Sequence, residues 1–364
     1  MSRLLFFASL LALACGRVNR DVGSYKPPLG EVGAGGEAGA ANRPDTPENG
    51  SSLELDKPWK SSGCGMPLPN KQPNADGFTS WELTQPGETL TTSDPALANT
   101  RSYLVHVPDD YDPSRPYRIV YLLQGGCYGP GEVSMNVLDL ANASQGGDPQ
   151  AIYVDVGMPG LDVNPHCYDT GTGTESLEYE AFELMHSSVE SRYCVDNNRI
   201  FVAGYSQGGA LSNMWGCYFA GTPTPARKFS PRWAIRGHAV VGGWREPNEP
   251  QPCNGPDAAI WIQETGDSVS SMYEDSNPSA LMVALNADGC TGNYDEGPKQ
   301  PWAPAGDIAG FKPGDCQRYT GCSAQTLREH PLVYCRVDDA PGTDRPDLAI
   351  PAFTAFFHSM DPSP

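Results

Sequence analysis

The sequence predicts an α/β fold in which helices cover both faces of a mostly parallel sheet. Three observations lead to this prediction. Short apolar runs bounded by turn residues recur from residue 101 onward, segments of helical period lie between them, and one serine sits in a glycine-rich turn where a strand gives way to a helix.

The expected strands differ in how their apolar residues are arranged. Residues 117–123 (YRIVYLL) are nearly all apolar, which is typical of a strand buried on both faces. Residues 102–107 (SYLVHV) partly alternate, which favours an antiparallel or edge strand. Further strands are expected at 151–156, 199–203, 239–241, 258–262 and 332–337, and helices at 175–193, 208–219 and 351–358.

The first sixty residues predict export followed by a tether. Arg3 precedes an apolar run from Leu4 to Leu13, which is too short to span a bilayer and fits a signal peptide over residues 1–15. The junction at Cys15 resembles a bacterial lipobox, so we expect a lipid anchor on this cysteine, with ordinary signal cleavage nearby as the alternative. Residues 16–60 are rich in glycine and proline and predict a disordered tether, which leaves one domain over residues 61–364.

Charge and cysteine content narrow the choice of partners and compartment. The formal net charge of −20 disfavours nucleic acid as a partner, although acidity also serves simply to keep an exported protein soluble. The 11 cysteines leave an even set of ten once Cys15 is removed, which fits disulfides in an oxidising compartment or, for some of them, buried thiols. No C-x-x-C pair is present, so we expect no metal site, and we expect no cofactor.

The turn that carries chemistry is Gly204-Tyr205-Ser206-Gln207-Gly208, which fits G-x-S-x-G. An expected strand ends at Gly204 and an expected helix follows, which is the context of a nucleophile elbow. Ser206 is therefore the candidate nucleophile, and the backbone N–H of Gln207 is a candidate oxyanion donor. A tight glycine turn without catalysis is the alternative.

Two further groups complete the expected site. An oxyanion hole needs a second N–H from a loop after an earlier strand, and the strand 117–123 runs into Gln124-Gly125-Gly126. A catalytic acid is expected beyond a later strand, and Asp267 follows the strand 258–262.

The chain resembles the carbohydrate esterase family one group, which includes feruloyl esterases, acetylxylan esterases and polyhydroxybutyrate depolymerases. The motifs that carry this resemblance cover residues 64–358 in order: 107–113, 115–117, 124–127, 193–196, 199–209, 265–267, 289–290 and 319–322. The resemblance implies an α/β-hydrolase fold, Ser206 as nucleophile and Asp267 as acid.

The sequence departs from that family at two positions. Gln124 stands where the family usually has a supportive histidine. More seriously, Thr343 stands where the catalytic histidine is usual, and threonine cannot take a proton near neutral pH. Of the six histidines, only His166 follows the carboxyl end of an expected parallel strand, so it is the one candidate substitute.

Folding is expected to bring Cys194, just before the elbow strand, close to Cys217 on the helix after the elbow. We therefore expect a Cys194–Cys217 disulfide, and also Cys127–Cys167 and Cys290–Cys322.

Two functions fit these observations. The first is an exported esterase, lipid-anchored in the cell envelope or extracellular, that hydrolyses esters of polysaccharides or polyesters and touches a membrane only through its anchor. The second is a surface pseudoenzyme that binds glycan or polymer without turnover, because Thr343 replaces the usual base.

Overall fold

The structure is a computed structural model, and it describes the main secondary-structure elements of the expected domain. The described residues are 57–68, 81–83, 103–125, 143–156, 168, 177–221, 233–243, 253–264, 284, 288–290, 302–306, 308, 311–337 and 346–361. All of them belong to one compact unit formed by residues 55–364.

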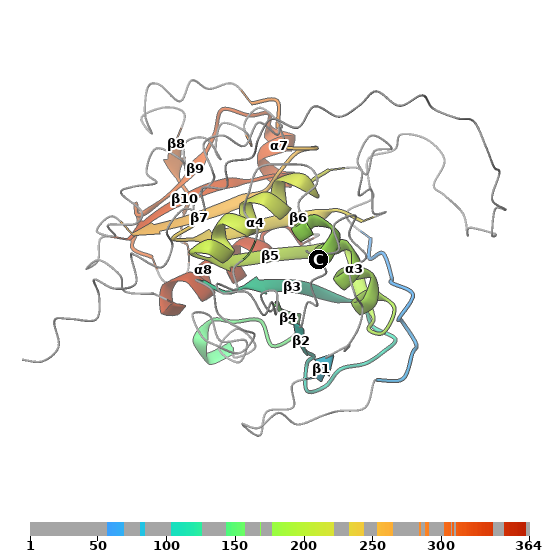
Figure 1. Ribbon diagram of the computed structural model, residues 1–364. Coiled ribbons are helices and arrows are strands. Elements are labelled where there is room, and N and C mark those ends of the chain that lie inside the picture. Colours follow the sequence, from blue (N-terminus) through green and yellow to red (C-terminus); the bar gives the residue numbers. More distant parts are fainter. Residues whose placement is uncertain are drawn as a thin grey trace, which may run out of the picture. The chain divides into compact units, whose positions relative to one another are not determined.

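The described strands form one sheet in the order β1-β2-β4-β3-β5-β6-β7-β10-β9-β8 (Figure 1). From β4 to β10 along this order every neighbouring pair is parallel, whereas β1, β2, β9 and β8 are paired antiparallel. The arrangement is that of an α/β hydrolase, so the predicted fold class is confirmed. The strands are β1 Trp81–Leu83, β2 Tyr103–His106, β3 Tyr117–Leu123, β4 Ile152–Val156, β5 Val195–Tyr205, β6 Ile235–Val241, β7 Ala259–Glu264, β8 Trp302–Pro304, β9 Cys316–Tyr319 and β10 Leu332–Val337.

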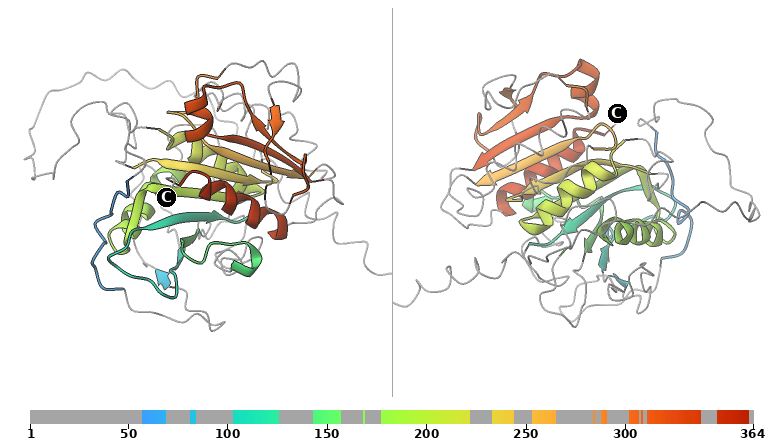
Figure 2. Two further views of the ribbon diagram at one scale, coloured as in Figure 1. Left: turned by 180° about the vertical axis from the view of Figure 1, so that it is seen from behind. Right: turned by 45° about the horizontal axis from the view of Figure 1, so that its top comes forward.

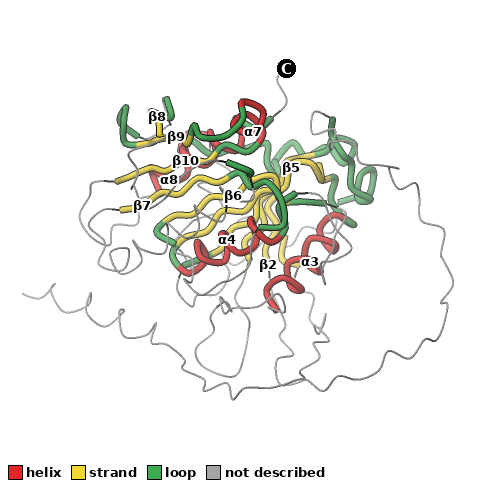
Figure 3. The backbone as a smooth tube through the Cα atoms, turned by 90° about the horizontal axis from the view of Figure 1, so that it is seen from above, coloured by secondary structure: helices red, strands yellow, loops and turns green. Residues whose placement is uncertain are grey.

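Helices cover both faces of the sheet, as expected for parallel strands that are buried on both sides. Figure 1 shows α3 (Leu177–Glu190) and α4 (Gln207–Tyr218) in front of the sheet, and the reversed view in Figure 2 brings α8 (Pro346–His358) forward. Figure 3 also shows α3 and α4 on the same side of the strands. The described part contains two shorter helices, the 3-10 turn η2 (Ala143–Gln145) and α7 (Ala324–Glu329).

Alternate residues of β3 serve two different cores. Ile119 and Tyr121 pack in the cluster that includes α3 and α4 residues. Val120 and Leu122 pack in the cluster that includes α8 residues. The strand is almost entirely apolar because the side chains on each of its faces are buried under a layer of helices.

The element boundaries agree with the sequence where strands are long and apolar. The bounds 117–123 and 332–337 are confirmed as β3 and β10. In contrast, β6 begins at Ile235, so His238 lies inside this strand and not before it. β1, β8 and β9 were not predicted, because each is only three or four residues long and too short to show a period.

The folded part begins earlier than the predicted boundary at residue 61. Lys60 forms an antiparallel bridge with Asp196, and the N–H of Trp59 donates to Asp196 Oδ1 at 2.9 Å. A disulfide joins Cys64 to Cys194 directly before β5. Residues 57–60, assigned to the tether, are therefore packed against the start of β5.

The predicted Cys194–Cys217 disulfide is wrong, because Cys194 pairs with Cys64 and Cys217 with Cys253. The physical reason is the different rise of the two elements. From the elbow, α4 runs back only about 15 Å to Cys217, whereas β5 spans roughly 35 Å.

The other predicted pairs have different outcomes. The Cys290–Cys322 disulfide is confirmed, and the structure adds Cys316–Cys335 between β9 and β10. Cys127 and Cys167 lie outside the described residues.

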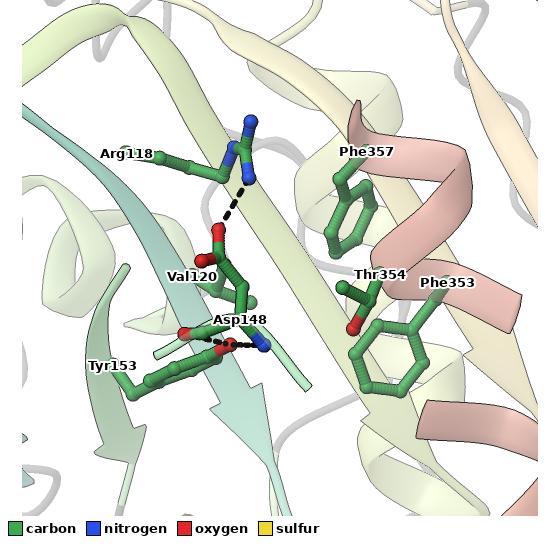
Figure 4. Close-up of a pocket in the computed structure, with 7 residues that line it drawn as sticks. All are labelled: Arg118, Val120, Asp148, Tyr153, Phe353, Thr354 and Phe357. Atoms are coloured by element: carbon green, nitrogen blue, oxygen red, sulfur yellow. Dashed lines mark hydrogen bonds and ion pairs between the residues drawn. The ribbon is translucent and has the colours of Figure 1, made fainter. Parts of the chain in front are cut away.

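A cluster of charged side chains lies at the amino ends of the parallel strands. Arg118 of β3 pairs with Asp148 at 2.5 Å and with Asp361 after α8. His358 at the end of α8 places Nε2 3.2 Å from Asp148 and Nδ1 3.3 Å from Asp361. Figure 4 shows Arg118 pointing toward Asp148 beside α8, in a pocket whose cavity of about 10 Å³ has room for one water at most.

This cluster predicts a stability contribution that is lost at alkaline pH. Hydrogen bonds to Asp148 and then Asp361 raise the pKa of His358 to about 9, against the opposing charge of Arg118. Because the folded-state pKa is the higher one, the stabilisation is complete below about pH 6.5 and disappears as pH rises through about 9. His358 is half-exposed, so solvent screening limits the contribution to about 1 kcal/mol.

The measurement is urea unfolding of the wild type and His358→Gln between pH 6 and pH 10. We expect the variant to be less stable at pH 6 and equal to the wild type at pH 10. A stability difference that stays constant across this range would contradict the ionic role of His358.

Candidate active site

The turn between β5 and α4 has the backbone geometry of a nucleophile elbow. Ser206 has φ 52° and ψ −118°, and it is the one non-glycine residue with positive φ in the described part of the chain. Residues that carry a side chain rarely adopt this backbone conformation, and holding one in it costs on the order of 1–3 kcal/mol. The Ser206 N–H donates to the carbonyl of Val241 at 2.8 Å, and the Ser206 carbonyl accepts from Ala210 N–H at 3.0 Å, so the strained residue is fixed on both sides.

The glycines of the motif allow the close approach that this turn requires. A Cβ added to Gly204 would lie under 3.0 Å from the backbone of Gly208. A Cβ on Gly208 would lie under 3.0 Å from the carbonyl oxygens of Leu123 and Gln124. The first turn of α4 is therefore in direct contact with the end of β3, where a side chain would not fit.

Sheet register places the ends of the neighbouring strands at the level of the elbow. Gly204 is paired with Leu123 of β3, and Tyr205 with Val241 of β6. One strand further, Val241 is paired with Ile262 of β7. The carboxyl ends of these parallel strands thus meet at one edge, which is where ligands bind in α/β sheets.

The expected oxyanion side of the site lies where the start of α4 contacts the end of β3. Gln207 is the first residue of α4, as the predicted oxyanion role requires. Gln124 is buried, and its Nε2 donates to Asp155 Oδ1 of β4 at 2.9 Å. Its side chain therefore ties β3 to β4, and the role of Gln124 and Gly125 in oxyanion binding stays a prediction.

The structure adds Tyr168, which the sequence analysis missed. The Tyr168 hydroxyl donates to the Val156 carbonyl at 2.8 Å and accepts from the Gln124 N–H at 3.3 Å. The Tyr168 carbonyl accepts from Gln207 Nε2 at 3.3 Å. Tyr168 lies two residues after His166 in the sequence, and its aromatic ring and hydroxyl suit a buried bridging position.

Several predicted residues lie outside the described residues, namely Gly126, His166, Asp267 and Thr343. The strands that lead toward two of them are described. β7 ends at Glu264 and β10 ends at Val337, and these two residues are paired in parallel register. The last described residues before Asp267 and Thr343 therefore lie side by side at the edge of the sheet that holds the elbow.

Two of the described histidines are almost fully buried and form hydrogen bonds inside the fold. Burial lowers the pKa of His186 to about 3, and its Nδ1 lies 2.7 Å from the hydroxyl of Tyr121. His238 is paired with Val202, about 10 Å before the elbow along the strands, and it contacts Asp257 and Asn213 at 3.1 and 3.2 Å.

The other three described histidines belong to the opposite edge of the sheet. His106 is paired with Tyr153 near the start of β4. His330 comes just before β10, and burial lowers its pKa to about 4. His358 belongs to the cluster with Arg118. Among the described histidines, none is placed as a base for Ser206.

The described residues lack two other kinds of feature. They contain no group of three or more His, Cys, Asp or Glu side chains arranged to hold a metal ion. Within the same residues, every helix is too short or too polar to cross a bilayer.

Comparison with known proteins finds sequence similarity to esterases. It is 28% identical over 141 residues to feruloyl esterase D of Neurospora crassa, covering 36% of this chain and 44% of that protein. It is 28% identical over 158 residues to a probable feruloyl esterase C of Aspergillus niger, covering 42% of this chain and 52% of that protein. The chain is therefore similar in sequence to feruloyl esterases over part of its length. This similarity confirms the resemblance that the sequence motifs indicated.

The match covers only part of these proteins, since the chain spans about half the length of the curated relatives. No protein-family model matches the sequence. Among solved structures, this chain is similar to an acetyl xylan esterase from Aspergillus awamori, with a TM-score of 0.49 and 12% identity over 78% of this chain and 100% of that chain. A feruloyl esterase module from Clostridium thermocellum in complex with sinapinate gives a TM-score of 0.48 and 14% identity over 84% of this chain and 97% of that chain.

Proposed function

We propose that the protein is an exported serine esterase that hydrolyses ester bonds of extracellular polysaccharides or polyesters. The observation that carries the proposal is the strained backbone of Ser206 at the turn between β5 and α4. A strained backbone at this position needs a compensating use, because an unstrained turn would be more stable. The relationship to feruloyl esterases supports the choice of ester substrates.

The proposed reaction forms an acyl-enzyme. The Ser206 oxygen attacks the ester carbonyl carbon, and the carbonyl oxygen becomes an oxyanion that faces the N–H of Gln207. Collapse of this intermediate breaks the bond to the alcohol, which leaves with a proton. Water then attacks the acyl group on Ser206, releases the acid and returns a proton to the serine.

The proton transfers are the steps of this reaction that lack an evident catalytic group. A histidine normally takes the serine proton and gives it to the leaving alcohol. Thr343 occupies the usual position of that base, and the described histidines lie elsewhere. We therefore propose that hydrolysis is slow and is supported by oxyanion stabilisation and substrate binding alone. Asp267 is the proposed acid that would orient a base.

A pseudoenzyme that binds glycan or polymer without turnover is the second candidate. Thr343 is the observation that favours it. The two functions differ in whether Ser206 reacts.

Hydrolysis of nitrophenyl acetate tests the proposed function. We expect weak turnover by the wild type, on the order of 10³–10⁴ times the rate in water, because the oxyanion hole and binding alone support catalysis of that size. Ser206→Ala should abolish it, and His166→Ala should change it little. Equal rates for the wild type and Ser206→Ala would leave the binding function as the better proposal.

The compartment and the anchor belong to the same proposal. The four disulfides among the described residues are typical of proteins in an oxidising compartment. We propose that export uses residues 1–15, and that a diacylglyceryl group on Cys15 attaches the mature protein to the cell envelope.

Replacement of the anchor cysteine gives a direct test. Cys15→Ser should release the protein from membranes or block its processing, because serine cannot form the thioether to the lipid. The measurement is membrane fractionation with mass spectrometry of the mature N-terminus. An unmodified N-terminus at another residue in the wild type would contradict the lipid anchor.

A further inference from the structure

We propose that Tyr168 is a positioning residue that holds the end of β3 and the start of α4 at the spacing that oxyanion binding requires. The inference rests on the proposed function, because it concerns the same reaction at Ser206. It concerns a residue that the sequence motifs do not mark.

Tyr168 joins three elements through different atoms. Its hydroxyl donates to the carbonyl of Val156, the last residue of β4, and accepts from the N–H of Gln124, the first residue after β3. Its carbonyl accepts from the Nε2 of Gln207, the first residue of α4. One buried residue, 3% exposed, thus links the ends of β4 and β3 to the residue whose N–H faces the expected oxyanion.

These links lie where small displacements matter. Gly208 already packs against the carbonyls of Leu123 and Gln124, so the elbow and the end of β3 are in contact. The oxyanion hole is expected to take one N–H from each of these two segments. A displacement of about 1 Å at such a site can cost up to about 10²-fold in rate, because preorganised donors act only at hydrogen-bond distance from the developing charge.

A second buried tyrosine provides a matched control. The Tyr153 hydroxyl accepts from the N–H of Asp148 at 3.2 Å and donates to its carbonyl at 3.1 Å, which is the same pair of bond types (Figure 4). Tyr153 lies near the start of β4, in the pocket beside α8, at the edge opposite the elbow. Loss of either hydroxyl removes two buried backbone contacts, but only Tyr168 touches the site.

The experiment measures phosphonylation of Ser206 by a fluorophosphonate in the full-length wild type, Tyr168→Phe and Tyr153→Phe. We expect Tyr168→Phe to slow the reaction by about tenfold or more, and Tyr153→Phe to stay within about twofold of the wild type. Urea unfolding should show similar losses of stability for both variants. With nitrophenyl acetate, the loss in Tyr168→Phe should fall on kcat and leave KM unchanged, because the oxyanion forms only in the transition state.

The outcomes separate the inference from the proposed function. A reactive wild type with equal rates for Tyr168→Phe and Tyr153→Phe would overturn the positioning role alone, as would a loss confined to KM. A wild type that does not react at Ser206 would overturn the proposed function and this inference with it. If Tyr168→Phe fails to fold, Gln207→Ala, which removes the bond to the Tyr168 carbonyl, should also slow phosphonylation, and an unchanged rate would overturn the inference.

Discussion

Thr343→His is expected to raise the rate of nitrophenyl acetate hydrolysis by at least about tenfold, because a positioned general base typically contributes about 10²–10⁴-fold. The end of β10, six residues before position 343, lies beside the end of β7, three residues before Asp267. A histidine at position 343 would therefore be expected to face both Ser206 and Asp267. The new activity should rise with pH through about 6.5, where an imidazole loses its proton.

The controls for this prediction distinguish a base from a change in shape. Thr343→Asn introduces a polar side chain that cannot act as a base, so it should not raise the rate. Ser206→Ala in the Thr343→His background should abolish the gain. Vigorous wild-type turnover that collapses in His166→Ala would instead make His166 the base, and no Ser206-dependent turnover in either protein would favour binding without catalysis.

Gly208→Ala is expected to destabilise the fold by roughly 3 kcal/mol and to stop phosphonylation of Ser206. The added Cβ would lie under 3.0 Å from the carbonyl oxygens of Leu123 and Gln124, which are backbone atoms that cannot move without displacing β3. Alanine favours a helix over glycine by about 1 kcal/mol, so helix propensity alone predicts the opposite sign. Overpacking is the larger effect, and the measurement is urea unfolding together with the phosphonylation rate.

Gly314→Ala is the matched comparison, since Gly314 has φ +97° but no atom within 4 Å of an added Cβ. It should cost only about 1 kcal/mol, from backbone strain, and leave phosphonylation unchanged. Equal stability and reactivity of the two variants would show that the close contact at Gly208 is not what requires glycine.

Much of the fold could be predicted because long buried strands have a distinctive composition. The bounds of β3 and β10 follow directly from their apolar runs, and the elbow could be located from the glycines around Ser206. β8 and β9 could not be predicted, because three or four residues carry no usable period and the strands exist through pairing with β10.

The details of the site depended on contacts between distant segments. Cys194 could not be assigned to Cys64 from the sequence, because Cys64 borders a stretch that has the composition of a tether. Tyr168 could not be found either, since its role depends on three strand and helix ends that meet only after folding. In contrast, the motif located Ser206 because the residues that define the elbow are adjacent in the sequence.

The most direct measurement is intact-protein and peptide mass spectrometry after treatment with a fluorophosphonate, in the wild type and in Ser206→Ala. We expect one phosphonyl adduct on the wild type, located on the peptide that contains Ser206, and no adduct on the variant. An unreacted wild type, or an adduct that persists in Ser206→Ala, would contradict Ser206 as the nucleophile of the proposed esterase.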